Sequence, residues 1–201
     1  MDYSKVKDYD YKTLFKNKHY SYFDKGIYNL NIIGIRSKGS GCTNKYDDFM
    51  IVIYNDEKQQ EQRKVFNITT DPGIYYLHKP ESSKGTAILV PGQYRSCWEI
   101  GKHKNKYNAL VQVKPVKVYR DNNKDDIYDL DPSTIKEGCF GINIHRSAMY
   151  GTTTFINNYS AGCQVFQNAA QFELFMKLCN KQKSIYGNSF TYTLIEEKDL
   201  V

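Results

Sequence analysis

The feature that most constrains the fold of this chain is a series of short apolar runs separated by turn-forming residues. The runs lie at 26–37, 49–55, 64–70, 86–94, 109–121 and 189–195. Their length and their alternating or β-branched composition are typical of strands. Pro72-Gly73 lies between two β-rich runs, and Pro115 confines its position to a sheet edge or a bulge. The runs therefore predict a mixed or mainly antiparallel sheet.

One segment has the periodicity of a helix instead. Asn168 is a typical N-cap residue, and Gln171 follows it at the spacing of a capping box. The segment predicts a helix over 168–181, packed against the sheet. Its apolar residues recur at helical spacing and form one stripe, namely Phe172, Phe175, Met176 and Cys179. We expect Cys179 to act as a small core residue on this stripe rather than as a reactive thiol.

The balance of strands and helix predicts a mainly β fold, a β-rich α+β domain with one main C-terminal helix. A chain of 201 residues with 40 % hydrophobic residues is long enough for one substantial core. The first 25 residues are rich in tyrosine and lysine and are expected to form an N-terminal arm or a small layer. Residues 26–201 are then the single β-rich domain.

The charge and the N-terminus limit the classes of partner. The formal net charge of +6 comes from basic and acidic residues interspersed along the whole chain, without a clustered basic face. Since no recognised nucleic-acid-binding motif occurs either, no nucleic acid is expected as a partner. The N-terminus has no apolar run typical of a signal peptide, and no run approaches the ~18 apolar residues of a membrane span. The sequence therefore predicts synthesis without a signal peptide, and a cytoplasmic or virion-associated protein.

The cysteines argue against two common structural devices. Their number is five, and none forms a CxxC pair. This pattern favours neither a complete disulfide framework nor a structural zinc site, so at least one thiol is expected to be free. No metal and no cofactor are expected.

One histidine and one cysteine stand in a spacing that suggests chemistry. Fourteen residues separate His145 from the sequence Ser160-Ala161-Gly162-Cys163. A free thiol has a pKa of ~8.5, so a nucleophilic cysteine needs a base or backbone N–H groups to favour its anion. His145 ends an alternating segment and can project from a strand end, while the small residues allow a turn whose N–H groups form an oxyanion hole.

Each residue taken alone has a simpler explanation, since free cysteines are often buried and single histidines are often structural. Their joint spacing around Ser-x-Gly favours catalysis. The run from His145 to Cys163, followed by a short strand, a capped helix and a last strand, resembles the L,D-transpeptidase (YkuD-like) catalytic domain. The resemblance is specific over 138–195 and suggestive over 64–137. It implies a sandwich-like sheet.

The resemblance also implies an activity and a site. In that family a cysteine is acylated by a peptidoglycan stem peptide next to a diamino acid, and the acyl group passes to an amine or to water. By position, Cys163 resembles the nucleophile and His145 the general base. Ser160 and Gly162 match the residues that shape the loop and the oxyanion hole. In its lack of a signal-peptide run and in its general character, the sequence resembles phage- or prophage-encoded proteins that act at the cell wall. This likeness implies that a virion or a phage assembly is a further partner.

Two positions depart from the family pattern. Arg146 stands where the family usually has glycine, and Val165 stands where it usually has arginine. Arg146 either replaces the lost arginine as a holder of a substrate carboxylate or is a solvated surface group. Arg146 and Ala161 are the expected substrate-binding residues. The departures also allow a hydrolytic variant in which water releases the acyl group.

Other patterns are weaker. Asp121, Asn123, Asp125 and Asp129 have offsets like those of a calcium loop, but the expected glycine and glutamate are missing, which favours a solvated acidic turn. His19, His78 and His103 lie in polar, lysine-rich surroundings without metal-ligand spacing.

The alternatives to the enzyme remain open. One is a non-catalytic structural or wall-binding virion protein that keeps the fold; the missing arginine at Val165 favours it. The other is a protein-cleaving cysteine protease, which no particular residue favours.

Overall fold

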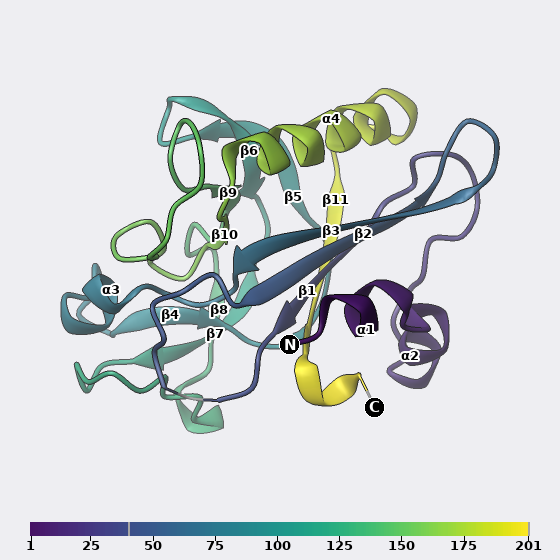
Figure 1. Ribbon diagram of the computed structural model, residues 1–201. Coiled ribbons are helices and arrows are strands. Elements are labelled where there is room, and N and C mark those ends of the chain that lie inside the picture. Colours follow the sequence, from purple (N-terminus) through teal and green to yellow (C-terminus); the bar gives the residue numbers. More distant parts are fainter. Residues whose placement is uncertain (40, 201) are drawn as a thin grey trace.

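Eight strands of the computed structural model, which describes residues 1–39 and 41–200, close into a barrel (Figure 1). In barrel order they are β1 (Asn31–Arg36), β11 (Phe190–Glu196), β5 (Gly92–His103), β6 (Tyr107–Gln112), β9 (Ile144–Arg146), β10 (Gln164–Phe166), β3 (Glu61–Thr69) and β2 (Asp48–Asn55). The pairs β1–β11 and β9–β10 are parallel, and the other neighbours are antiparallel. The mainly β class is confirmed, but the sandwich-like arrangement is wrong, because β1 closes the sheet on β11.

A second, three-stranded sheet lies beside the barrel, and helices cover both. Its strands are β4 (Thr86–Leu89), β7 (Val116–Asp121) and β8 (Lys136–Gly138), in the order β4-β7-β8. The helices are α1 (Tyr3–Asp8), α2 (Tyr11–Asn17), α3 (Ile74–His78) and α4 (Ala169–Tyr186), with single 3-10 turns η1 (Pro132–Thr134) and η2 (Glu197–Asp199). No helix in the described part of the chain is long and apolar enough to cross a membrane.

Strands β1 and β2 are buried on both faces, which explains their nearly continuous apolar sequence. Met50 and Val52 point into the barrel core, whereas Ile51 and Ile53 point the other way. Ile51 and Ile53 belong to a second apolar cluster on the outer face of the barrel. The N-terminal helices complete this cluster with Tyr11 and other apolar side chains. Residues 3–17 thus form a layer on the barrel wall (Figure 1).

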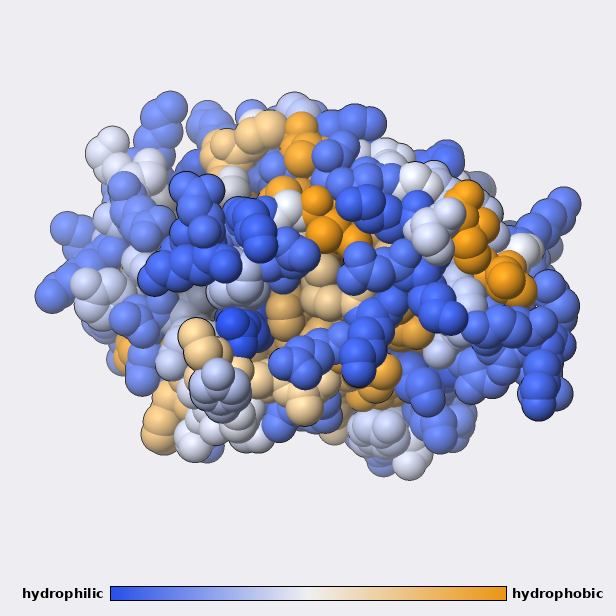
Figure 2. Space-filling view, turned by 90° about the horizontal axis from the view of Figure 1, so that it is seen from above, coloured by the Kyte–Doolittle hydropathy of each residue, from blue (hydrophilic) through white to orange (hydrophobic). Residues whose placement is uncertain are grey.

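Helix α4 packs its predicted stripe into the barrel core, and all four stripe residues, Cys179 included, are buried. The side chain of Asn168 accepts a hydrogen bond from the backbone N–H of Gln171, so the predicted N-cap is confirmed. The helix runs five residues past the predicted end at 181 and stops at Gly187, whose φ of 88° favours glycine. Seen from the side of α4, the surface is largely hydrophilic, with apolar side chains showing near its centre (Figure 2).

The strands predicted from the sequence are confirmed in part. The runs at 26–37, 49–55, 64–70 and 189–195 each contain a strand, while 109–121 is divided at Pro115 into β6 and β7. The run after Pro72-Gly73 is wrong as a strand, because it forms α3. Here the N–H of Gly73 donates to the carbonyl of Ser160, and Leu77 is buried under the second sheet.

The tryptophan of β5 ties the barrel to the segment that leads into β9. Trp98 is fully buried, with its ring edge-on to Tyr94 and Tyr192. Its indole N–H donates to the carbonyl of Ile142 at 2.7 Å. The backbone just before β9 is therefore held against the core.

Candidate active site

The parallel pair β9–β10 brings the predicted histidine and cysteine to one face of the sheet. Val165 lies opposite His145 in the register, and Gln164 opposite Ile144. Side chains two residues apart on a strand point to the same face. Cys163, two residues before Val165, therefore projects from the same face as His145. Both side chains line one pocket of about 210 Å³, together with Glu81, Lys104 and other residues.

The geometry of His145 fixes which ring nitrogen carries its proton. Nδ1 lies 2.7 Å from the carbonyl oxygen of Arg146, which can only accept, so Nδ1–H is the donor. Nε2 of the neutral ring is then an unprotonated base. The ring of His103 stacks on His145 with centroids 4.0 Å apart. Burial, reinforced by the neighbouring His103, lowers the pKa of His145 to about 3, so the imidazole is neutral at pH 7.

The thiol of Cys163 is half-buried and makes two backbone contacts. Its Sγ accepts from the N–H of Asn143 at 3.4 Å and donates to the carbonyl of Gly141 at 3.3 Å. Burial raises the pKa of Cys163 to about 11; the Asn143 N–H and Lys104 oppose the rise only partly. The sequence argument required a lowered pKa, and the direction is the opposite, because desolvation outweighs the lowering effect of Lys104. At neutral pH the thiol and the imidazole are both uncharged.

The turn before Cys163 is held by Ser160 and fitted against β4. The buried Ser160 hydroxyl donates to the carbonyl of Cys163 at 2.8 Å and accepts from the N–H of Gly162 at 3.2 Å. Gly162 has φ 116°, and a Cβ there would lie 2.1 Å from the carbonyl oxygen of Ala87. Both residues thus help to set the conformation of this turn. The Gly162 N–H, however, is bound to Ser160 and does not point freely to an oxyanion.

The two expected substrate-binding residues line different pockets. Arg146 lines a neighbouring pocket of about 370 Å³; its guanidinium stacks 4.3 Å from the Tyr107 ring centre, and Nη1 donates to the Met149 carbonyl at 2.6 Å. Ala161 lines the Cys163 pocket and a second pocket next to it. Val165, at the position where L,D-transpeptidases usually have arginine, is fully buried in an apolar cluster that offers no place for a guanidinium.

Sequence reasoning missed residues that hold this site together. His103 was expected in polar surroundings but is buried, and its Nδ1 accepts from the Asn143 side chain at 3.1 Å. The pKa of His103 is lowered to about 4, chiefly by burial. The lysines around His103 in the sequence masked this burial. Asn143 contacts His103 through its side chain and Cys163 through its backbone, and its position between two isoleucines gave no signal.

The weaker sequence candidates form no second site. Asp121 and Asp125 accept hydrogen bonds from backbone N–H groups of their own loop, and His78 pairs with Asp126 at 2.8 Å. Among the described residues, no group of three His, Cys, Asp or Glu side chains is placed to hold a metal ion. All five cysteines are free thiols.

Models of protein families, curated proteins and solved structures were each compared with the chain, and none matched.

Proposed function

We propose that this chain is a cysteine-dependent enzyme that cuts or exchanges a peptide bond next to a diamino acid in peptidoglycan stem peptides. The observation that carries the proposal is the shared pocket of Cys163 and His145, in which the imidazole has its Nδ1 proton bound to a carbonyl. A base held in one tautomer in the same pocket as a thiol is an arrangement from which nucleophilic catalysis can proceed. The substrate class comes from the resemblance of the motif to L,D-transpeptidases.

In the proposed reaction the two groups start uncharged. His145 Nε2 takes the proton of Cys163 as the sulfur attacks the substrate carbonyl carbon, forming a thioester and breaking the peptide bond. The imidazolium then gives that proton to the leaving amine. An amine or water attacks the thioester in the second step, and the thiol is regenerated. The stacked His103 and the Asn143 contacts support the imidazole and the thiol in these positions.

The experiment is digestion of purified sacculi, followed by separation of the muropeptides. We expect the wild type to shorten or exchange stem peptides, Cys163→Ala to be inactive, and His145→Gln to lose about 10²- to 10⁴-fold in rate. The matched control is Cys139→Ala, which removes an exposed thiol outside the pocket and keeps full activity. Mass spectrometry of the wild type with substrate should show an acyl adduct on Cys163.

A second candidate is a non-catalytic wall-binding or virion protein. The raised pKa of Cys163 favours it, since a resting thiol of this kind is not preactivated. Under this alternative the wild type binds sacculi, leaves the muropeptides unchanged and binds equally well as Cys163→Ala. That result would end the enzymatic proposal.

A further inference from the structure

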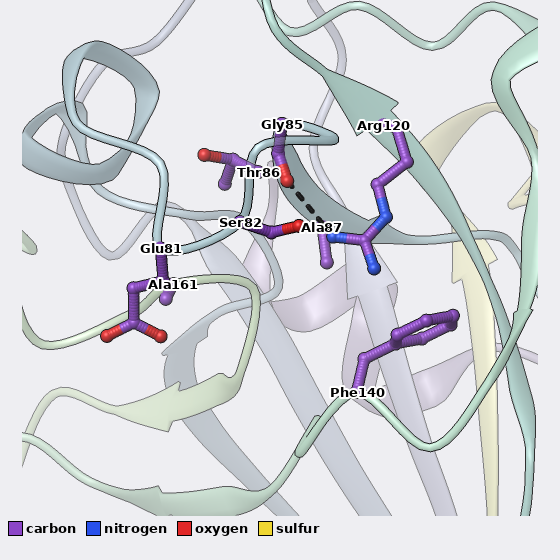
Figure 3. A pocket seen from close by; sticks show the side chains of 8 residues that line it. All are labelled: Glu81, Ser82, Gly85, Thr86, Ala87, Arg120, Phe140 and Ala161. Atoms are coloured by element: carbon purple, nitrogen blue, oxygen red, sulfur yellow. Dashed lines mark hydrogen bonds between the residues drawn. The ribbon is translucent and has the colours of Figure 1, made fainter.

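A second pocket of about 220 Å³ adjoins the one that contains the thiol, and it is lined by an arginine on one side and a glutamate on the other. The two pockets share Glu81, Phe140 and Ala161 as walls. Figure 3 shows the guanidinium of Arg120 pointing into the pocket above Phe140, with Glu81 and Ala161 across from it. The pocket therefore presents both charges next to the pocket that contains Cys163.

The fold places Arg120 beside the thiol through the second sheet. Arg120 lies opposite Ala87 in the register of β4 and β7. The carbonyl of Ala87 is the atom against which Gly162, the residue before Cys163, is packed. On the other wall, the guanidinium stacks 4.5 Å from the ring centre of Phe140, and the next residue, Gly141, contacts the sulfur.

The guanidinium of Arg120 can donate more hydrogen bonds than the protein around it accepts. Within the described residues its hydrogen-bond partner is the Gly85 carbonyl, 3.0 Å from Nη1, and no carboxylate forms an ion pair with it. Its Nε–H is buried without a partner. A buried donor without an acceptor is unfavourable, and a carboxylate that reaches the guanidinium from the pocket would accept charge-assisted hydrogen bonds from it.

We propose that this pocket is the subsite for a zwitterionic amino-acid group of the substrate, with Arg120 holding the carboxylate and Glu81 the ammonium. The inference rests on the proposed function, because it assigns the subsite to the diamino acid whose bond is cut. Glu81 selects against ligands that carry negative charge alone. Arg120 thus takes the role that sequence reasoning gave to Arg146, whose guanidinium already contacts Met149 and Tyr107.

The test measures binding to the inactive Cys163→Ala protein, so that it does not depend on turnover. The Nε–Hε signal of Arg120 is followed by NMR during titration with 2,6-diaminopimelate, which has an ammonium and a carboxylate on one carbon. Pimelate, without the ammoniums, and 1,5-diaminopentane, without the carboxylates, are the matched probes. We expect saturable shifts with diaminopimelate, weaker binding of pimelate and no shift with the diamine.

The variants separate the two charges. Arg120→Gln should weaken diaminopimelate binding at least about tenfold, and Arg120→Lys, which keeps the charge but not the two-pronged geometry, should weaken it less. Glu81→Gln should remove the preference for diaminopimelate over pimelate. Arg95→Gln removes an exposed arginine outside the pocket and should change nothing. The melting temperature of each variant reports whether it is folded.

The outcomes distinguish this proposal from the proposed function. If diaminopimelate causes no shift at Arg120, or binds equally to folded Arg120→Lys, Arg120→Gln and wild type, the subsite is refuted even if sacculi are digested. If the shifts appear as expected and sacculi remain unchanged, the subsite stands and the catalytic proposal fails.

Discussion

At the scale of single residues, the chemistry of the candidate site depends on two uncharged side chains. With the pKa of His145 lowered to about 3 and that of Cys163 raised to about 11, neither group ionises across the neutral range. In the proposed reaction, proton transfer must therefore accompany attack, as it does in serine hydrolases, whereas a preformed thiolate–imidazolium pair would have transferred the proton beforehand. The sequence could supply the two residues but not their protonation, since desolvation depends on neighbours from β5 and β6.

The raised pKa of Cys163 predicts how it reacts with iodoacetamide. A raised thiol pKa moves the thiolate to higher pH, so between pH 7 and 10 the labelling rate should rise about tenfold per pH unit without a plateau. The exposed Cys139 should be labelled before Cys163 at pH 7. The measurement is peptide mass spectrometry of timed reactions over a pH series. Faster labelling of Cys163 than Cys139 at pH 7, with a midpoint below 8.5, would contradict the neutral pair.

His103 shows why part of the site was hidden from sequence reasoning. Its neighbours Lys102, Lys104 and Lys106 are typical of an exposed turn, yet its own side chain points inward and stacks on His145. That contact joins β5 to β9, which lie far apart in the sequence. Asn168 was predictable because its cap depends only on residues within one helical turn.

At the scale of elements, the periodicity of the sequence located most strands and the main helix, because each depends on local alternation or on one apolar stripe. It placed a strand end at His145 but did not give the bounds of the three-residue strand β9, and it did not predict the closure of the barrel. Closure comes from the parallel pair β1–β11, whose strands are separated by most of the chain. Periodicity carries no information on which strands become neighbours, so a sandwich and a barrel were not distinguished.

The fit of the turn at residues 160–163 against β4 gives a second prediction. Gly162→Ala places a methyl group against the Ala87 carbonyl at a φ of 116°, which residues with side chains rarely adopt. We expect a loss of about 1–3 kcal/mol in the free energy of unfolding and a large loss of activity, because the displaced loop carries Cys163 with it. Urea unfolding and the sacculus assay measure the two effects.

The control for that substitution is Gly41→Ala. Gly41 has open space around its Cα and a φ outside the positive range, so stability should change by less than about 0.5 kcal/mol. Equal stability of the two variants would mean that the β4 contact does not hold the loop.

At the scale of the whole molecule, the N-terminal helices α1 and α2 bury the outer face of strands β1 and β2 in the barrel wall. Val6, Tyr11 and Phe15 cover Ile33 and Ile51 on the outer face of β1 and β2. Without these helices a contiguous aliphatic surface would meet water on strands whose other face is already in the core. The N-terminal residues are thus coupled to the stability of the strands that close the barrel.

Deletion of residues 1–20 tests this coupling. We expect the shortened chain to have a melting temperature at least about 10 °C lower and to bind a hydrophobic dye, because several fully buried side chains lose their cover. Differential scanning calorimetry and dye fluorescence measure both effects. Lys12→Ala, which removes only an exposed ion pair with Asp24, should leave both unchanged. A deletion variant as stable as the full chain would show that the layer is dispensable.

The position of Trp98 gives the molecule an optical reporter of its own site. It is the single tryptophan of the chain, and its indole N–H is bonded to Ile142, between the two residues whose backbones contact the sulfur of Cys163. A ligand that displaces this segment must alter that bond, and indole emission responds to such a change in its surroundings. Occupancy of the pocket can therefore be followed by the ultraviolet fluorescence of the unlabelled protein, in real time and without a chromogenic substrate.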